Sequence, residues 1–137
     1  MDRVLLLHWN EAEAKERAGL LSKAGVEIAG LVWSGGEVMK TLKKCAPVDA
    51  IVISLERVPS HGRVVGAYLR QTKSTSSLPL IYIECPDAEK VAKVKAALPD
   101  AQFTTWKGVA GLVKKAMPVE SPLVPGWSIA SGKLVRD

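Results

Sequence analysis

Short apolar runs alternate with amphipathic stretches five times between residues 3 and 117, and this alternation limits the folds open to the chain. Three of the runs, Val4–Leu7, Ala50–Leu55 and Leu80–Ile83, are almost free of polar residues. Such runs are typical of strands that are covered on both faces. The amphipathic stretches repeat apolar residues every three to four positions, as a helix packed on one side does. Each strand is therefore followed by a helix that can cross back over a parallel sheet.

The predicted elements form five strand–helix units. The expected strands are 4–7, 26–33, 50–55, 80–83 and 102–106, and the expected helices begin near residues 11, 38, 63, 87 and 109. This order predicts an α/β fold, a flavodoxin-like (βα)5 three-layer sandwich with parallel strand order 2-1-3-4-5. Sites in such sheets form at the carboxyl ends of the strands. Here those ends carry residues 8–10, 34–36, 54–56, 84–85 and 106–107.

The composition is that of one soluble domain. Of the 137 residues, 47% are hydrophobic and 24% are charged, which is enough apolar material for a core of ordinary size. No apolar run approaches the ~20 residues of a membrane-spanning helix, and the first residues lack the apolar segment of a signal peptide. Cys45 and Cys85 are too few for a disulfide framework. We therefore expect a cytoplasmic protein without membrane association.

The net charge of +5 comes from 19 basic and 14 acidic residues. The lysines are grouped at positions 40, 43 and 44, at 90, 93 and 95, and at 114 and 115, and each group is interleaved with apolar residues at helical spacing. Aromatic and basic residues do not alternate as they do on a surface that stacks nucleic-acid bases. The pattern favours solvated helix faces and disfavours nucleic acid as a partner.

Seven short motifs lie at or beside the predicted strand ends. They are His8-Trp9, Gly25–Ile28, Ser34–Val38, Asp49–Leu55, His61-Gly62, Leu78–Ile81 and Lys107. In order and spacing, these motifs resemble those of response-regulator receiver (CheY-like) domains over residues 3–117. The resemblance implies the receiver fold and a role in two-component signal transduction.

The resemblance also shows which functional positions of the receiver family are replaced. His8 and Trp9 stand where the family has the acidic pair that holds Mg²⁺, and neither is a hard anionic ligand. Ser54 stands at the phospho-accepting aspartate, with Leu55 as the alternative because the loop to Pro59 is one residue longer. Neither candidate is a carboxylate, so the resemblance implies a chain that is not phosphorylated.

Three further positions complete the comparison with receivers. Glu84 stands where the family has a hydroxyl or amide, and its negative charge would repel a phosphate. Thr104 occupies the position of the aromatic switch residue, and Lys107 is the only functional residue that is kept. We expect Glu84 and Lys107 to form an ion pair, because a partly buried lysine needs a partner. The resemblance thus implies a degenerate pseudo-receiver that has no cofactor.

Other chemistry at the strand ends is weighed against this interpretation. Ser54 could act as a nucleophile only with a base within reach, and His8 on the neighbouring strand is the candidate base. No nucleophile-elbow motif occurs in the sequence, so we expect no catalytic residues and instead a buried His8 that Trp9 shields. The two histidines and two cysteines lack the spacing of zinc ligands, so no metal site is expected.

Residues 118–137 form an extension beyond the receiver-like domain of residues 1–117. Its three prolines, Pro118, Pro122 and Pro125, exclude a continuous helix, yet the segment is too apolar for a free tail. Residues 128–135 could pair as a hairpin or add a strand to another chain. We expect the extension to pack on the domain or on a partner, with Trp127 as the contact residue to test.

These features predict a phosphorylation-independent regulatory module that acts through contacts with a protein partner or a second copy. We expect it to use the strand-end pocket and the surface of the fourth and fifth helices. One alternative is a small-molecule-binding or enzymatic flavodoxin-like domain that uses the same crevice. The other is a basic nucleic-acid-binding protein.

Overall fold

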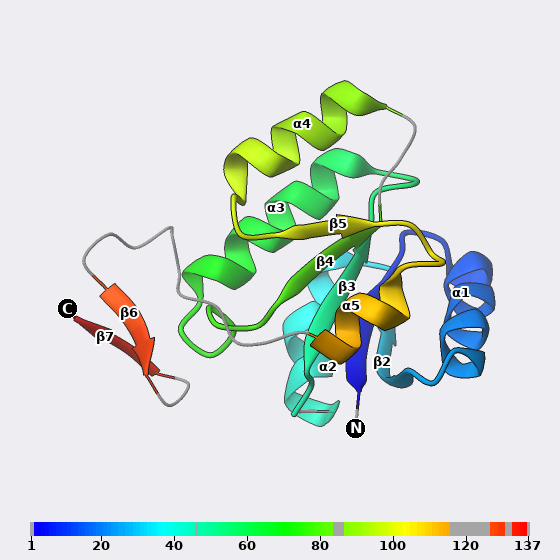
Figure 1. The fold of residues 1–137 in the computed structure, drawn as a ribbon, viewed down its shortest axis with the longest axis horizontal. Coiled ribbons are helices and arrows are strands. Elements are labelled where there is room, and N and C mark those ends of the chain that lie inside the picture. Colours follow the sequence, from blue (N-terminus) through cyan, green and yellow to red (C-terminus); the bar gives the residue numbers. More distant parts are fainter. Residues whose placement is uncertain (1, 46, 84–86, 116–126, 131–132, 137) are drawn as a thin grey trace.

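Five parallel strands form one sheet in the order β2-β1-β3-β4-β5 (Figure 1). The structure is a computed structural model that describes residues 2–45, 47–83, 87–115, 127–130 and 133–136. The strands are β1 (Arg3–Leu7), β2 (Glu27–Val32), β3 (Ala50–Ser54), β4 (Leu80–Ile83) and β5 (Gln102–Thr104). This topology confirms the predicted flavodoxin-like sheet.

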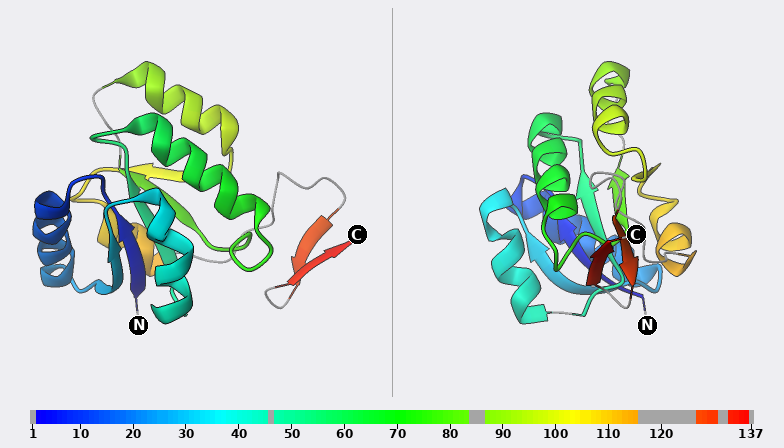
Figure 2. Two further views of the ribbon diagram at one scale, coloured as in Figure 1. Left: turned by 180° about the vertical axis from the view of Figure 1, so that it is seen from behind. Right: turned by 90° about the vertical axis from the view of Figure 1, so that its left-hand side faces the viewer.

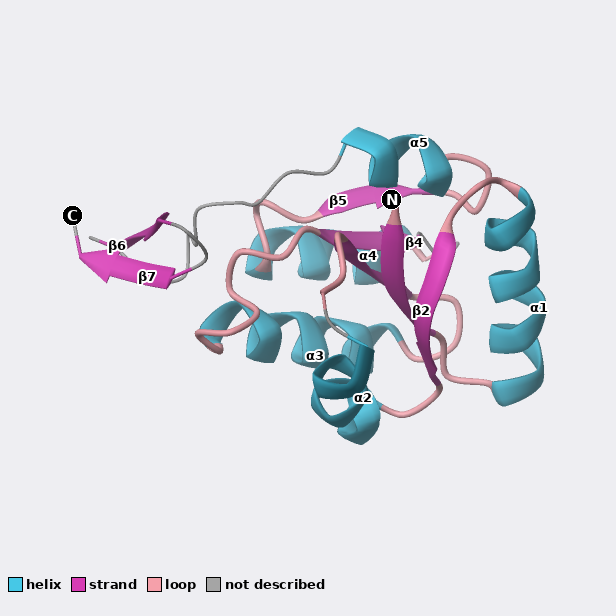
Figure 3. Ribbon diagram, turned by 90° about the horizontal axis from the view of Figure 1, so that it is seen from below, coloured by secondary structure: helices cyan, strands magenta, loops and turns pink. Residues whose placement is uncertain are grey.

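The helices cover both faces of this sheet. They are α1 (Glu11–Lys23), the short 3-10 turn η1 (Gly35–Glu37), α2 (Val38–Cys45), α3 (Pro59–Gln71), α4 (Ala88–Ala97) and α5 (Val109–Lys115). Helices α1 and α5 lie on one face, and α2, α3 and α4 lie on the other (Figures 2 and 3). Each face has its own buried apolar cluster. The central strands β1 and β3 contribute to both clusters, which explains why their sequences contain so few polar residues.

Helix α3 begins four residues earlier than the sequence predicts. We expected a loop up to Gly62 and a helix from Arg63, but the helix starts at Pro59. Proline suits the first helical position, because its fixed φ matches the helix and its missing N–H has no partner there in any helix. Strand β5 is shorter than predicted and ends at Thr104, so Trp106 lies in the turn that follows it.

A second, two-stranded antiparallel sheet follows the domain. It consists of β6 (Trp127–Ala130) and β7 (Lys133–Arg136), and it is not joined to the parallel sheet. Of the two arrangements considered for this segment, the structure has the hairpin. Residues 118–126 and the side chain of Trp127 lie outside what the structure describes, so the predicted packing of the extension stays a prediction. In the described ranges, no helix is both long and apolar enough to span a bilayer.

Candidate functional site

His8 lies at the carboxyl end of β1, at the edge where parallel sheets place their sites. Its side chain is completely buried, and its backbone N–H donates to the Val32 carbonyl of β2 at 3.1 Å. The ring Nε2 lies 2.8 Å from Glu13 Oε1. Its Nδ1 atom is buried and has no hydrogen-bond partner among the described residues. His8 is therefore anchored on one side only.

Glu13 connects His8 to Arg57. The Arg57 Nε donates to Glu13 Oε1 at 3.1 Å, and its Nη2 pairs closely with Glu13 Oε2. The backbone N–H of Glu13 donates to the Asn10 side chain at 2.9 Å, which caps the start of α1. This cap fixes the helix end from which the carboxylate reaches both partners. The three side chains form a charged cluster, named here the His8 cluster.

The neighbours of Glu13 favour its ionised form. The hydrogen bond from Arg57, with a smaller contribution from His8, lowers the pKa of Glu13 from its ordinary value of 4.5 to about 2. The same pairing raises the pKa of Arg57. When the pKa of a carboxyl group is lower in the folded state than in the unfolded state, folding favours the ionised carboxylate. The carboxylate therefore stabilises the fold at pH values above its unfolded pKa.

This shift predicts a particular pH dependence of stability. The contribution of Glu13 should be fully present above about pH 4.5 and should disappear as the pH falls toward 2. Urea unfolding of wild type and Glu13→Gln should therefore show a difference in midpoint that shrinks across this window. Glu11→Gln removes one charge from the same helix and serves as the control. If the difference in urea midpoint between wild type and Glu13→Gln stays the same at every pH, the cluster is not formed in solution.

Trp106 covers His8 from the β5 side. The two rings meet edge-on, with centroids 6.2 Å apart and planes at 70°. The indole Nε1 donates to Glu56 Oε1 at 2.5 Å, and the Arg17 guanidinium lies 5.3 Å from the centre of the indole ring. The sequence-based expectation that Trp9 shields His8 is therefore wrong. The ring of Trp9 packs against His61 instead, at a centroid distance of 5.9 Å.

Ser54 is buried at the end of β3, and its hydroxyl is hydrogen-bonded to the backbone. Ser54 Oγ accepts a hydrogen bond from the Glu56 N–H at 3.2 Å. The base considered for it, His8, is bound to Glu13 instead. Among the described residues the two therefore do not form a nucleophile–base pair. This hydrogen bond closes the turn that follows β3.

The remaining predicted positions are only partly described. Glu84 lies outside the described residues, so its expected ion pair with Lys107 stays untested. Lys107 is exposed in the turn after β5. The reason given for the ion pair, that a partly buried lysine needs a partner, therefore does not apply. Thr104 lies half-buried at the end of β5. The structure thus brings His8, Ser54 and Trp106 to one edge but leaves Lys107 in solvent.

Among the described residues, the carboxylates at this edge do not fit Mg²⁺, the ion that receiver chemistry requires. The ion prefers free, hard oxygen ligands. Glu13 is bound by Arg57 and His8, and Glu56 is bound by Trp106 and lies 3.7 Å from Arg17. Within the described ranges no group of three or more His, Cys, Asp or Glu residues could hold a metal.

Sequence reasoning missed the charged partners of His8. Glu13 belongs to α1 and Arg57 to the loop after β3, so neither stands at a strand end. One signal was present, since Asn10 and Glu13 have the spacing of a helix-capping pair. Arg57 had no such signal, because it lies 44 residues from Glu13 and meets it only in the fold.

Comparison with solved structures identifies the fold as that of receiver domains. A sensor protein from Polaromonas sp. JS666 superposes with a TM-score of 0.68 at 17% identity, over 83% of this chain and 94% of that one. A putative response regulator from Chloroflexus aurantiacus gives 0.67 at 19% identity, over 82% and 94%. The response regulator TrrA from Thermotoga maritima gives 0.64 at 18% identity, over 85% and 100%. No family model and no curated protein sequence matches the chain.

Proposed function

We propose that this chain is a pseudo-receiver, a regulatory module with the receiver fold that works through protein contacts without being phosphorylated. The observation that carries the proposal is the His8 cluster. At the edge where a phosphoryl group and its metal would have to bind, the carboxylates of Glu13 and Glu56 are bound by the chain's own side chains. Binding of a metal ion and a phosphoryl group at this edge would have to break these existing charge pairs, and breaking them costs free energy.

The residue types at the edge support the same proposal. Ser54 offers a buried hydroxyl that already closes a turn, and it has no adjacent base to activate it. Trp106 lies over His8 and fills space beside it. We therefore infer that residues 1–117 form a module that is not an enzyme, with residues 118–137 as a separate extension. The half-buried free thiol of Cys45 is usual in a protein from a reducing compartment such as the cytoplasm.

Beryllofluoride, a mimic of the phosphoryl group, tests the proposal. The Thermotoga maritima regulator was crystallised with Mg²⁺ and beryllofluoride, whereas this chain should bind neither. Adding both should leave the tryptophan fluorescence unchanged, although Trp9 and Trp106 lie on either side of the edge and would report binding. Lys107→Ala, which alters the only retained receiver residue, should behave as wild type does. A saturable change that Lys107→Ala or Ser54→Ala abolishes would refute the proposal.

A further inference from the structure

A small cavity lies between the first turns of α3 and α4. Strands β3 and β4 are parallel neighbours, so the helices that follow them on one face run side by side and begin at the same edge of the sheet (Figures 1 and 2). The cavity has a volume of about 40 Å³. Three residues of each helix line it, namely Pro59, Ser60 and Arg63 of α3 and Lys90, Lys93 and Val94 of α4. The fold thus gathers residues that are distant in the sequence around one small space.

Half of the residues that line this cavity are basic, and none is acidic. Arg63 and Lys90 make no ion pair with a described acid. Lys93 lies 3.9 Å from Glu89 of the same helix, but both side chains are more than half exposed, and such pairs are weak. The Asp87 carboxylate caps α4 by accepting the N–H groups of Glu89 and Lys90 at 3.1 and 3.2 Å. Three like charges therefore line the cavity, and an anion that enters it relieves their repulsion.

The start of α3 adds hydrogen-bond donors beside the cavity. The N-cap residue, Val58, provides no side-chain cap, and Pro59 follows it at the first helical position. Among the described residues, neither the backbone N–H nor the hydroxyl of Ser60 has a hydrogen-bond partner. The partial positive charge at the N-terminus of a helix favours an anion. This helix end thus acts in the same direction as the three basic side chains.

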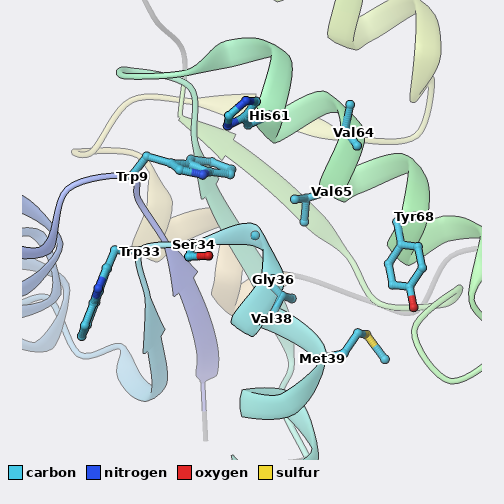
Figure 4. Close-up of a pocket in the computed structure, with 11 residues that line it drawn as sticks. Trp9, Trp33, Ser34, Gly36, Val38, Met39, His61, Val64, Val65 and Tyr68 are labelled. Carbon is cyan, nitrogen blue, oxygen red and sulfur yellow. The ribbon is translucent and has the colours of Figure 1, made fainter.

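His61, which follows Ser60 in the first turn of α3, belongs to a different part of the surface. Figure 4 shows its ring beside Trp9, at one end of a larger groove between α2 and α3. That groove has a volume of about 790 Å³, and its lining contains no lysine or arginine. An anion would find no opposite charge among those residues, whereas it would find three in the small cavity.

The size and the charge of the small cavity select one class of ligand. A water molecule needs about 10–15 Å³ and a drug-sized ligand about 300 Å³ or more, so 40 Å³ suits a single small polyatomic group. A carboxylate would neutralise only one of the three charges, whereas a phosphate monoester carries about 1.5 to 2 negative charges at pH 7. Phosphate oxygens also match the planar fork of an arginine, which can donate two parallel hydrogen bonds.

We propose that this cavity binds a phosphate group without forming a covalent bond to it. The group is inorganic phosphate or the end of a small phosphate monoester, because both present the same oxygens. Arg63 donates to two of these oxygens, and Ser60 donates to another. Lys90 and Lys93 neutralise the remaining charge. The inference goes beyond the proposed function, since no residue of the His8 cluster lines the cavity.

An NMR titration of the isotope-labelled full chain tests the inference. The probes are sodium phosphate and methyl phosphate, each added to a phosphate-free buffer in which sodium chloride holds the ionic strength constant. The backbone amide signals of residues 60–63 and 90–94 should shift and reach saturation. The affinity should fall at least about tenfold in Arg63→Met and in Lys90→Gln/Lys93→Gln. Each variant removes charge that the bound phosphate would contact.

Matched variants separate this cavity from a general effect of charge. Lys114→Gln/Lys115→Gln removes two charges from α5 and should leave the affinity unchanged. Ser54→Ala alters the position of the receiver acceptor and should bind phosphate as wild type does. Without phosphate, the variants at the cavity should keep a melting temperature close to that of wild type, because both lysines are exposed and Arg63 makes no ion pair with a described acid.

The two probes identify the source of the phosphate group. Binding of phosphate alone assigns the cavity to the free ion, and binding of methyl phosphate assigns it to a monoester. The inference is overturned if neither probe gives saturable shifts at the cavity, if chloride alone produces the same shifts, or if either cavity variant keeps the wild-type affinity. Shifts that centre on His8 and Ser54 and disappear in Ser54→Ala would place the phosphate at the strand ends instead.

Discussion

Replacing Arg70 with methionine should destabilise the protein by about 3 kcal/mol, the lower end of the cost of breaking a buried ion pair. The Arg70 side chain is completely buried. Its Nε donates to Asp100 Oδ2 at 2.8 Å, and its Nη1 donates to the carbonyl oxygens of Ser76 and Leu78 at 3.2 and 2.6 Å. Methionine fills similar space but leaves three acceptors without their donor. Thermal unfolding should show a decrease in Tm of about 10 °C.

Arg63→Met is the matched control for this prediction. Arg63 belongs to the same helix but is only half-buried, and it makes no ion pair with a described acid, so its loss should change stability by less than about 0.5 kcal/mol. A double variant, Arg70→Met with Asp100→Asn, should recover part of the stability, because it removes the stranded charge. Equal Tm values for Arg70→Met and Arg63→Met would mean that the buried pair contributes nothing.

Gly66→Ala should destabilise the protein by about 2 kcal/mol, a cost typical of overpacking a core. A Cβ at Gly66 would overlap the Tyr82 hydroxyl and lie 2.7 Å from Leu98 Cδ1. That hydroxyl donates to the Gly62 carbonyl at 2.8 Å, and burial raises the pKa of Tyr82, so it remains a donor. Alanine would break this bond or push α3 away from the sheet. The loss is measured as a lower urea midpoint.

Gly19→Ala gives the opposite result and serves as the control. Gly19 is exposed in α1, and a Cβ there would meet nothing within 4 Å. Since alanine favours helix over glycine by about 1 kcal/mol, this variant should be more stable than wild type. If both variants gain stability, α3 has room over Tyr82 and the close approach of helix and sheet is not real.

The sheet could be predicted because strands that are buried on both faces consist almost entirely of apolar residues. Ala50 to Ser54 and Leu80 to Ile83 are buried along their whole length, and an uninterrupted apolar run has no other place in a domain of this size. The ends of helices and strands were harder to predict where the boundary depends on a single residue. Pro59 starts α3 rather than breaking it, because its effect depends on whether it falls in the first turn.

The site could be predicted only in its location and in what it lacks. The strand-end rule indicated His8 and Ser54, and the receiver resemblance implied that His8 and Trp9 replace the acidic pair. The sequence could not show what replaces it, since Glu13 reaches His8 from α1 and Arg57 reaches Glu13 across 44 residues.

Intact-mass spectrometry after incubation with acetyl phosphate and Mg²⁺ tests most directly whether the His8 edge is closed to phosphoryl chemistry. A receiver domain with its acidic pair and acceptor aspartate, treated in parallel, shows that the reagents are active. The pseudo-receiver account predicts that the wild-type chain and Ser54→Ala keep the same unmodified mass. Addition of one phosphoryl group to the wild-type chain, and not to Ser54→Ala, would contradict it.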